Sequence, residues 1–187
     1  MNSTASDHNR VPNERQSMRE YSGGQTMVNN LPYTAMIVLG TIALIVALDK
    51  STWGWITGTL YFIYGIVGVF WIIIFLCPYC VYCGTRSCPC GYGTIAGKLR
   101  EKQPGNRFGE KFKKHIPVIV PLWVIPILAG VPLVIRSFSW PLLVLLVVFG
   151  VDAFVILPLF STKHGCKKCP QRDSCPWMGR KSKPAST

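Results

Sequence analysis

Four long apolar stretches, separated by polar segments, dominate the pattern of this chain. They cover about residues 31–48, 53–76, 116–135 and 137–160, and only the last contains a charged residue, Asp152. A helix needs roughly 20 apolar residues to cross the hydrocarbon core of a bilayer. Helices of soluble bundles keep a polar stripe, which these stretches lack. The sequence therefore predicts an all-α integral membrane protein, a four-transmembrane-helix bundle.

Charge position predicts the orientation of this bundle. Charged residues make up only 15% of the chain, yet the formal net charge is +12. Of the 20 Lys and Arg, three lie in residues 1–30, eight in the loop 77–115 and seven in residues 161–187. Four spans place these segments on one side, and basic residues near span ends stay cytoplasmic. We expect a multi-pass protein of the cell membrane with cytoplasmic N- and C-termini and a mobile polar N-terminal tail, residues 1–30.

Aromatic and basic residues near the span ends agree with this orientation. An aromatic belt is expected at the opposite face, formed by Trp53, Trp55, Phe138 and Trp140. On the cytoplasmic side, Phe108, Phe112 and Ile116 recur every four residues among lysines, a pattern typical of a short interfacial helix. The expected partner of the basic residues is anionic membrane lipid. No nucleic acid is expected, because no binding motif accompanies the charge.

All eight cysteines lie in two short segments, each of which follows a span that ends on the cytoplasmic side. The first segment contains Cys77, Cys80, Cys83, Cys88 and Cys90, and the second contains Cys166, Cys169 and Cys175. The cytoplasm is reducing, so stable disulfides are not expected there. Clustered thiolates repel one another unless a cation neutralises them. We therefore expect a small cytoplasmic Cys-rich cap that binds metal.

The spacing leaves the identity of the metal open. The first segment, C-x2-C-x2-C-x4-C-P, resembles the bacterial ferredoxin motif with one extra residue, over about a dozen residues. This local resemblance implies one or two iron–sulfur clusters, of the 4Fe–4S kind, in an electron-transport subunit. Zinc is the alternative, held by C-x2-C pairs from both segments, with His164 as a further candidate ligand. The pair Cys77 and Cys80 leaves membrane thiol-redox chemistry as a third hypothesis.

Catalysis by the chain alone is not predicted. The sequence contains no phosphate-binding loop, dinucleotide fingerprint or serine-nucleophile elbow. Whether it is an enzyme stays open; we expect a non-catalytic or electron-transfer subunit, with a protein partner for redox or assembly. Asp152, the one charge within a span, is a candidate proton relay or a buried polar site. We expect it to face the bundle and to hydrogen-bond a hydroxyl, such as that of Tyr61 or Tyr64, or a backbone carbonyl.

The small residues and prolines of the spans predict close helix packing and a kinked third span. Gly54 and Gly58 open the second span with a G-x-x-x-G step, which favours close helix packing within the chain. The third span contains Pro117, Pro121, Pro126 and Pro132. Because proline cannot donate a backbone hydrogen bond, this span should be kinked. The carbonyls that its prolines free must find partners elsewhere in the protein.

Overall fold

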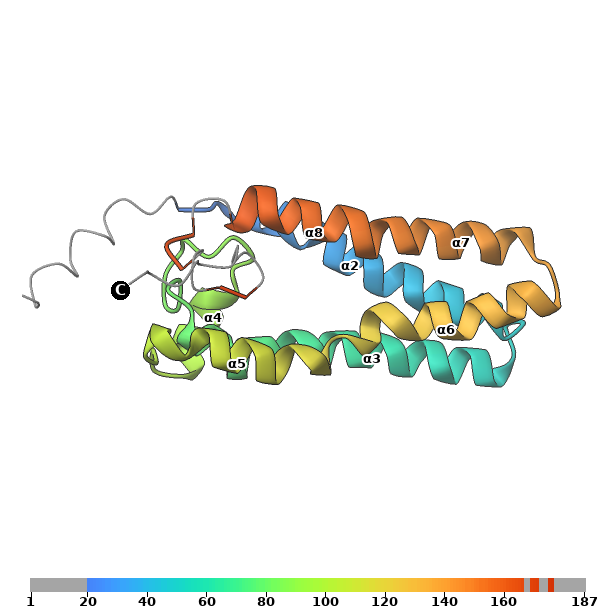
Figure 1. Cartoon of the computed structure of the whole chain (residues 1–187), viewed down its shortest axis with the longest axis horizontal. Helices are drawn as coiled ribbons and strands as arrows, with labels where there is room; N and C mark the ends of the chain where they lie inside the picture. The colour runs from blue at the N-terminus through green and yellow to red at the C-terminus, as the bar shows by residue number, and fades with distance from the viewer. Residues whose placement is uncertain (1–19, 167–168, 172–174, 177–187) are drawn as a thin grey trace, which may run out of the picture.

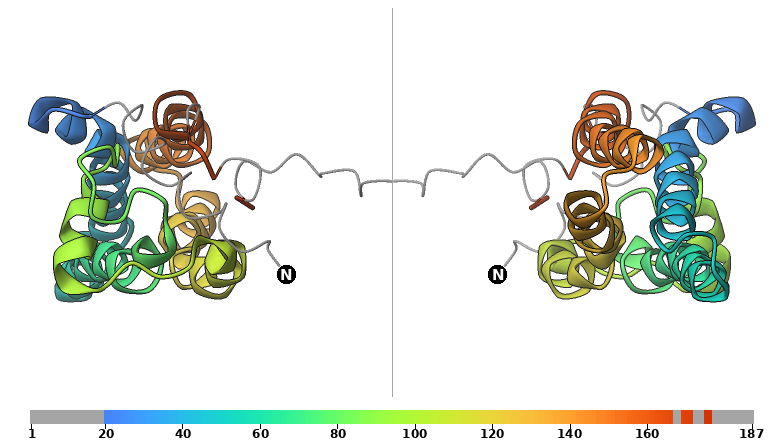
Figure 2. Two further views of the ribbon diagram at one scale, coloured as in Figure 1. Left: turned by 90° about the vertical axis from the view of Figure 1, so that its left-hand side faces the viewer. Right: turned by 90° about the vertical axis from the view of Figure 1, so that its right-hand side faces the viewer.

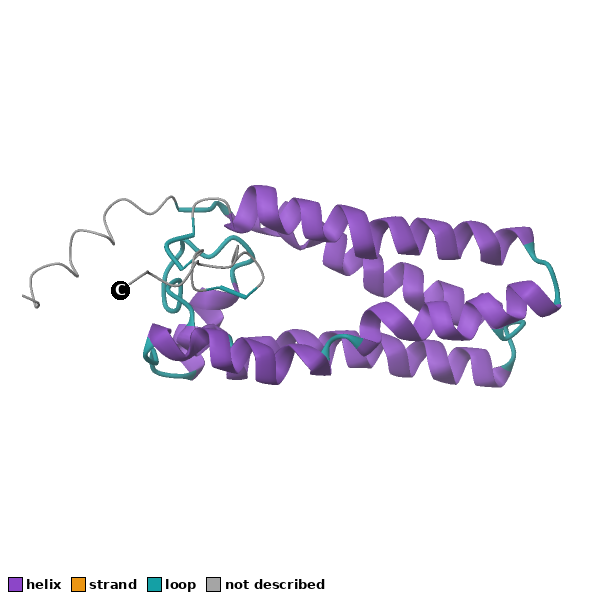
Figure 3. Ribbon diagram, viewed as in Figure 1, coloured by secondary structure: helices purple, strands orange, loops and turns teal. Residues whose placement is uncertain are grey.

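The computed structural model describes residues 20–166, 169–171 and 175–176. Every regular element in this part of the chain is helical (Figure 3). The long helices are α2 (Gly23–Ala47), α3 (Thr52–Phe75), α6 (Pro121–Arg136) and α7 (Trp140–Val151). The shorter α-helices are α4 (Tyr92–Leu99), α5 (Phe108–His115) and α8 (Leu157–Phe160). With the turns that extend them, four helical segments are long and apolar enough to cross a membrane.

The four helical segments lie side by side, and their connections alternate between the two ends (Figure 1). Helix α2 packs against α3, α6 and α7, as the end-on views of Figure 2 show. Their outward faces are rich in exposed aliphatic side chains, such as Leu60 and Leu128. Such faces suit contact with lipid, because a soluble helix would turn polar residues outward. The predicted all-helical architecture with four long apolar helices is therefore confirmed.

The first helix begins earlier than the sequence pattern predicted. Helix α2 begins at Gly23, although we expected a polar tail up to residue 30; residues 1–19 of that tail lie outside the described residues. Ser22 caps the helix, since its hydroxyl accepts a hydrogen bond from the N–H of Gln25 and the Gln25 side chain accepts one from the N–H of Ser22. This capping box satisfies two N–H groups that a helix start leaves without partners.

The glycines of α3 allow α2 to approach closely. A Cβ atom at Gly58 would lie 2.6 Å from Ile45, and one at Gly65 would lie 2.6 Å from Ile37. Gly40 on α2 likewise leaves room for the ring of Tyr61, because an added Cβ would lie 2.6 Å from that ring. The expectation that these small residues serve packing within the chain is confirmed.

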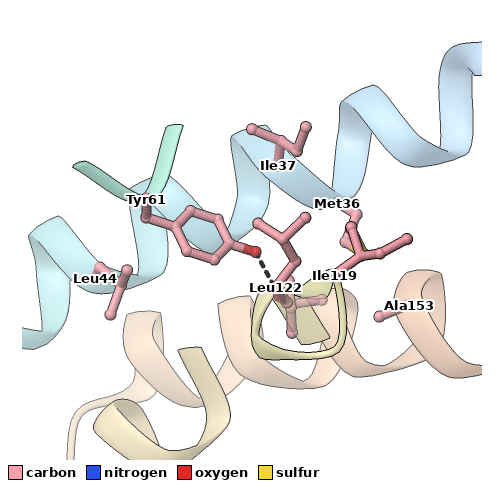
Figure 4. Packing of buried hydrophobic residues seen from close by; sticks show 8 residues of the cluster. Met36, Ile37, Leu44, Tyr61, Ile119, Leu122 and Ala153 are labelled. Carbon is pink, nitrogen blue, oxygen red and sulfur yellow. Dashed lines mark hydrogen bonds between the residues drawn. The ribbon is translucent and has the colours of Figure 1, made fainter. Parts of the chain in front are cut away.

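The third span is interrupted as its prolines predicted. It consists of α5, a 3-10 turn (Ile116–Val118) and α6, which starts at Pro121. The Tyr61 hydroxyl donates a hydrogen bond to the carbonyl of Leu122 at 2.6 Å, within the buried core shown in Figure 4. The Tyr64 hydroxyl donates to the carbonyl of Val118. Two hydroxyls of the second span thus satisfy carbonyls of the proline-rich span.

The two ends of the bundle differ in composition. Trp53, Trp55, Phe138 and Trp140 are exposed at the end opposite the cysteine loop, and the rings of Phe138 and Trp140 pack edge to face. At the loop end, Lys111 lies over the ring of Tyr79 and Arg100 over that of Phe75. Helix α5 is formed where the pattern predicted a short helix, with Phe108 buried, but it runs alongside α3 as the first part of the third helical segment (Gly105–Arg136) (Figure 1). These contacts place basic side chains beside the aromatic end of the second span.

Candidate functional site

The first cysteine segment folds as a series of tight turns. Pro78 follows the end of α3 within a 3-10 turn (Cys77–Tyr79) and cannot continue the helical ladder. The N–H of Cys80 then donates to the carbonyl of Cys77, and the N–H of Cys83 donates to that of Cys80, each at 3.1 Å. Turns of this kind bring sequence-adjacent cysteines to one compact loop.

Two glycines let this loop fold back on α4. Gly84 and Gly91 adopt φ angles of +75° and +76°, which are strained for residues with a side chain. The N–H of Gly84 donates to the carbonyl of Gly93 at 2.8 Å. At Gly93 and Gly97 an added Cβ would collide with backbone atoms of the loop. The loop and α4 therefore pack backbone against backbone, which holds the cysteine segment in shape.

The start of α2 holds the same loop from the other side. Asn29 Nδ2 donates to the carbonyl of Pro89 at 2.9 Å, and Asn30 Nδ2 donates to that of Cys90 at 3.0 Å. Reasoning from sequence missed these residues, because it placed them in a polar tail. The Ser22-x-x-Gln25 pattern was the signal that could have extended the helix to include them.

Gln171 fixes the second cysteine segment against the first. Its Oε1 accepts a hydrogen bond from the N–H of Val81 at 2.8 Å, and its Nε2 donates to the carbonyls of Tyr79 and Gly105. Cys169 also hydrogen-bonds the side chain of Tyr82. Two segments about ninety residues apart in the sequence therefore meet.

Five cysteines from the two segments line one cavity of about 220 Å³. They are Cys80, Cys88, Cys90, Cys169 and Cys175, and the lining also includes Asn29, Tyr82, Phe160, Ser161 and Gln171. The rest of the set is not brought together there. Cys77 and Cys83 do not line the cavity: they are buried against Ile73 and Ala96, although both remain within electrostatic reach of Cys88. The side chains of Cys166 and His164, also predicted as candidate ligands, lie outside the described part of the chain.

Burial keeps several of these thiols in the neutral form. It raises the pKa of Cys80 to about 12, and it also raises the pKa of Cys83 and of Cys169. Neighbouring cysteines add to this effect at Cys80, because a second thiolate nearby would repel the first. None of the seven described cysteines is in a disulfide. Ionising several of these thiols together requires a cation among them.

The thiols surround the cavity and do not converge on one point. Within the described residues, no group of three or more His, Cys, Asp or Glu is close enough to hold a metal ion. A zinc ion needs its sulfur ligands at roughly 2.3 Å. As the described side chains lie, the thiols therefore do not form a single-ion site.

Asp152 lies apart from this cavity, in the fourth span. It begins a π-helical turn (Asp152–Ile156) and is only 6% exposed, so it faces the bundle as expected. The expected hydrogen bond is not formed at Oδ2, which has no partner among the described residues. The hydroxyls of Tyr61 and Tyr64 donate to carbonyls of the third span instead. One of these competing acceptors, the carbonyl of Leu122, is free because Pro126 has no N–H to donate to it.

Comparison with known proteins assigns no relative to this chain. No family model, no curated protein and no solved structure matches it at a significant level.

Proposed function

We propose that this chain is a membrane-anchored metal-binding protein whose cysteine cavity holds an iron–sulfur cluster for electron transfer. One observation carries the proposal: five cysteines from two distant segments line the same 220 Å³ cavity. A cluster is held by four thiolates spread around a polyatomic core. The cavity lining supplies enough cysteines for such a set. Burial keeps thiols such as Cys80 and Cys169 protonated, and a bound cationic core would stabilise their thiolate form.

The lining of the cavity favours one set of ligands for this proposal. The local resemblance to ferredoxins suggested Cys77, Cys80, Cys83 and Cys88 as one set, but Cys77 and Cys83 are buried beside the cavity and do not line it. The proposed ligands are therefore Cys80, one of Cys88 and Cys90, and the pair Cys169 and Cys175. When bound, the cluster supplies one-electron chemistry. Gln171 and Asn29 keep the two segments in register around it.

A structural zinc site used for assembly is the second candidate. Gln171 already ties the second segment to the first, and zinc at this junction would lock the two together. Thiol-redox chemistry has less support. A reactive thiol is a thiolate at neutral pH, whereas burial raises the pKa of Cys80.

Anaerobic purification of the full chain separates these candidates. The iron–sulfur proposal expects bound iron and sulfide in equal amounts and a visible absorbance that dithionite bleaches and an oxidant restores. Replacing Cys80, Cys169 or Cys175 by Ser should remove most of the metal. The matched control is Cys83→Ser, which lies outside the cavity and should retain the metal. A colourless protein with one zinc per chain would support the assembly role instead, and metal-free protein would overturn both.

The orientation is part of the same proposal. The loop 77–115 and the segment after α8 lie at one end of the bundle, where most described basic residues gather (Figure 1). We place this end at the cytoplasmic face, next to anionic lipid, with a soluble or membrane redox partner. An impermeant maleimide should leave Cys88 and Cys175 unlabelled in intact cells and should label them after lysis and removal of the bound metal, which would otherwise protect them. Labelling of both without lysis would reverse the orientation.

A further inference from the structure

The fourth span contains a buried carboxyl group that does not line the cysteine cavity. Asp152 lies near the middle of the apolar segment Trp140–Lys163. Its side chain is 94% shielded, since only 6% is exposed. Eight residues of helix separate it from Phe160 at the cavity, about 12 Å along the axis. An ionisable group at this depth is costly and is a functional candidate by default.

No charged group faces this carboxyl from the helices that pack against it. The π-helical turn that Asp152 begins contacts α2, α7 and α8. These three helices contain no Lys, Arg, His, Asp or Glu in their described ranges, and Tyr33 of α2 is their one titratable residue. The Tyr33 hydroxyl donates to the carbonyl of Gly65 at 3.0 Å. Arg136, on α6, lies at the far end of the bundle.

Most of the neighbouring core is apolar. Ala153, the next residue, belongs to a core cluster with Met36 and Leu122, and the one hydroxyl of this cluster, that of Tyr61, donates to the carbonyl of Leu122 (Figure 4). A metal or alkali cation needs several oxygen ligands, and the aliphatic side chains of this cluster supply none. A carboxylate here would lose its hydration with nothing to replace it. A proton is the one ligand that neutralises the group without further donors.

The backbone at Asp152 is also unusual. The N–H of Leu157 donates to the carbonyl of Asp152, five residues back, which defines a π-helical turn. Pro158 follows and has no N–H to donate, so one more carbonyl of this turn lacks its helical partner. Such π turns are rare and occur mostly at functional sites. The carboxyl therefore sits at a local widening of the helix, not in a regular stretch.

We propose that Asp152 is a reversible proton-binding site within the membrane. In the loaded state its carboxylate has taken up one proton to form the neutral acid, and in the unloaded state it has released that proton to water. No other bond changes. The proposal does not rest on the cysteine cavity, and it would stand if the chain bound no metal.

Infrared spectroscopy of the full chain in liposomes tests the proposal directly. At neutral pH, protein labelled with ¹³C-aspartate should show the carbonyl band of a neutral carboxylic acid, and raising the pH should remove it reversibly. Asp152→Asn should lack the band at every pH. The isotope shift assigns the band to one of the four aspartates in the chain. Carbodiimide labelling, described below, locates the neutral carboxyl group by mass spectrometry, so the assignment does not depend on the variant folding. Asp49, exposed in the turn after α2, is the matched control and should show no neutral-acid band at neutral pH.

A hydrophobic carbodiimide gives a second readout, since it modifies neutral carboxyl groups within membranes. It should label Asp152 but not Asp49, and labelling should fall at least tenfold as the infrared band disappears. Protection by sodium ions at constant pH would overturn the proposal in favour of a cation site. A neutral-acid band that persists at every pH at which the protein stays folded would also overturn it, because the proton would then be purely structural.

Discussion

Tyr61 on α3 donates its hydroxyl hydrogen to the carbonyl of Leu122 on α6 at 2.6 Å. Leu122 lies one helical turn before Pro126, the residue whose N–H would bond this carbonyl in an unbroken helix. The second span thus supplies the donor that the third span lacks. In a bilayer, where water cannot act as the substitute, such a contact decides whether a proline is tolerated.

Removing the Tyr61 hydroxyl should destabilise the fold only while Pro126 is present. Tyr61→Phe leaves a buried carbonyl without a partner and should destabilise the fold by about 1–2 kcal/mol. In the background of Pro126→Ala, where an N–H is restored, the same change should cost much less. Thermal unfolding in detergent measures the four members of this cycle. Tyr64→Phe is the control, because Pro126→Ala restores no donor to its acceptor, Val118. Equal losses for Tyr61→Phe in both backgrounds would contradict the assignment.

Gly40→Ala should destabilise the bundle because its Cβ would collide with the ring of Tyr61. Overpacking of this kind costs about 1–3 kcal/mol. Gly150→Ala, in the fourth span, is the matched control, since nothing lies within 4 Å of its added Cβ. That change should be neutral or slightly stabilising. Thermal unfolding of both variants makes the comparison. Similar losses of stability for the two would show that the close contact between Gly40 and Tyr61 does not limit the stability of the bundle.

The asparagines of α2 should control the accessibility of the cysteine loop. Asn30→Ala removes the hydrogen bond to the carbonyl of Cys90 and should loosen the loop without unfolding the helix. We expect faster maleimide labelling of Cys88 and Cys90 in the lysed, metal-free protein, by about fivefold for a bond worth about 1 kcal/mol. Thr34→Ala is the control, because its hydroxyl bonds only within α2. Unchanged labelling would mean that α4, Asn29 and Gln171 hold the loop without this bond.

Cys80 should react slowly and with a characteristic pH dependence in the metal-free protein. Burial raises its pKa to about 12, so the neutral thiol persists and the thiolate fraction rises tenfold per pH unit from neutral pH to about pH 11. At pH 8 its alkylation should be about a thousandfold slower than that of an ordinary thiol. Mass spectrometry of alkylated peptides measures this rate. A plateau above pH 9 would contradict the effect of burial.

Sequence patterns predicted the scaffold better than the site. The apolar stretches and the prolines of the third span suffice for the four helices and for a kink, because both follow from the bilayer and from backbone hydrogen bonding. The spacing of Cys77, Cys80 and Cys83 did not predict that only Cys80 of these three reaches the cavity. Which side of a turn a thiol faces depends on packing against α4, which follows the loop directly, and against α2, which lies far away in sequence. For the same reason, the sequence did not predict that the Tyr61 hydroxyl donates to the carbonyl of Leu122 and not to Asp152.

The cavity draws on both halves of the chain, and this sets the order of biosynthesis. Cys80 and Cys88 leave the ribosome before the third and fourth spans are made, whereas Cys169 follows the fourth. The N-terminal part of a chain is synthesised and folds first. Closing the cavity must therefore wait until all four spans have been inserted with their ends on the correct sides. A chain with the third or the fourth span left out would present its two cysteine segments on opposite faces of the bilayer, so closure of the cavity reports that both of these spans have been inserted.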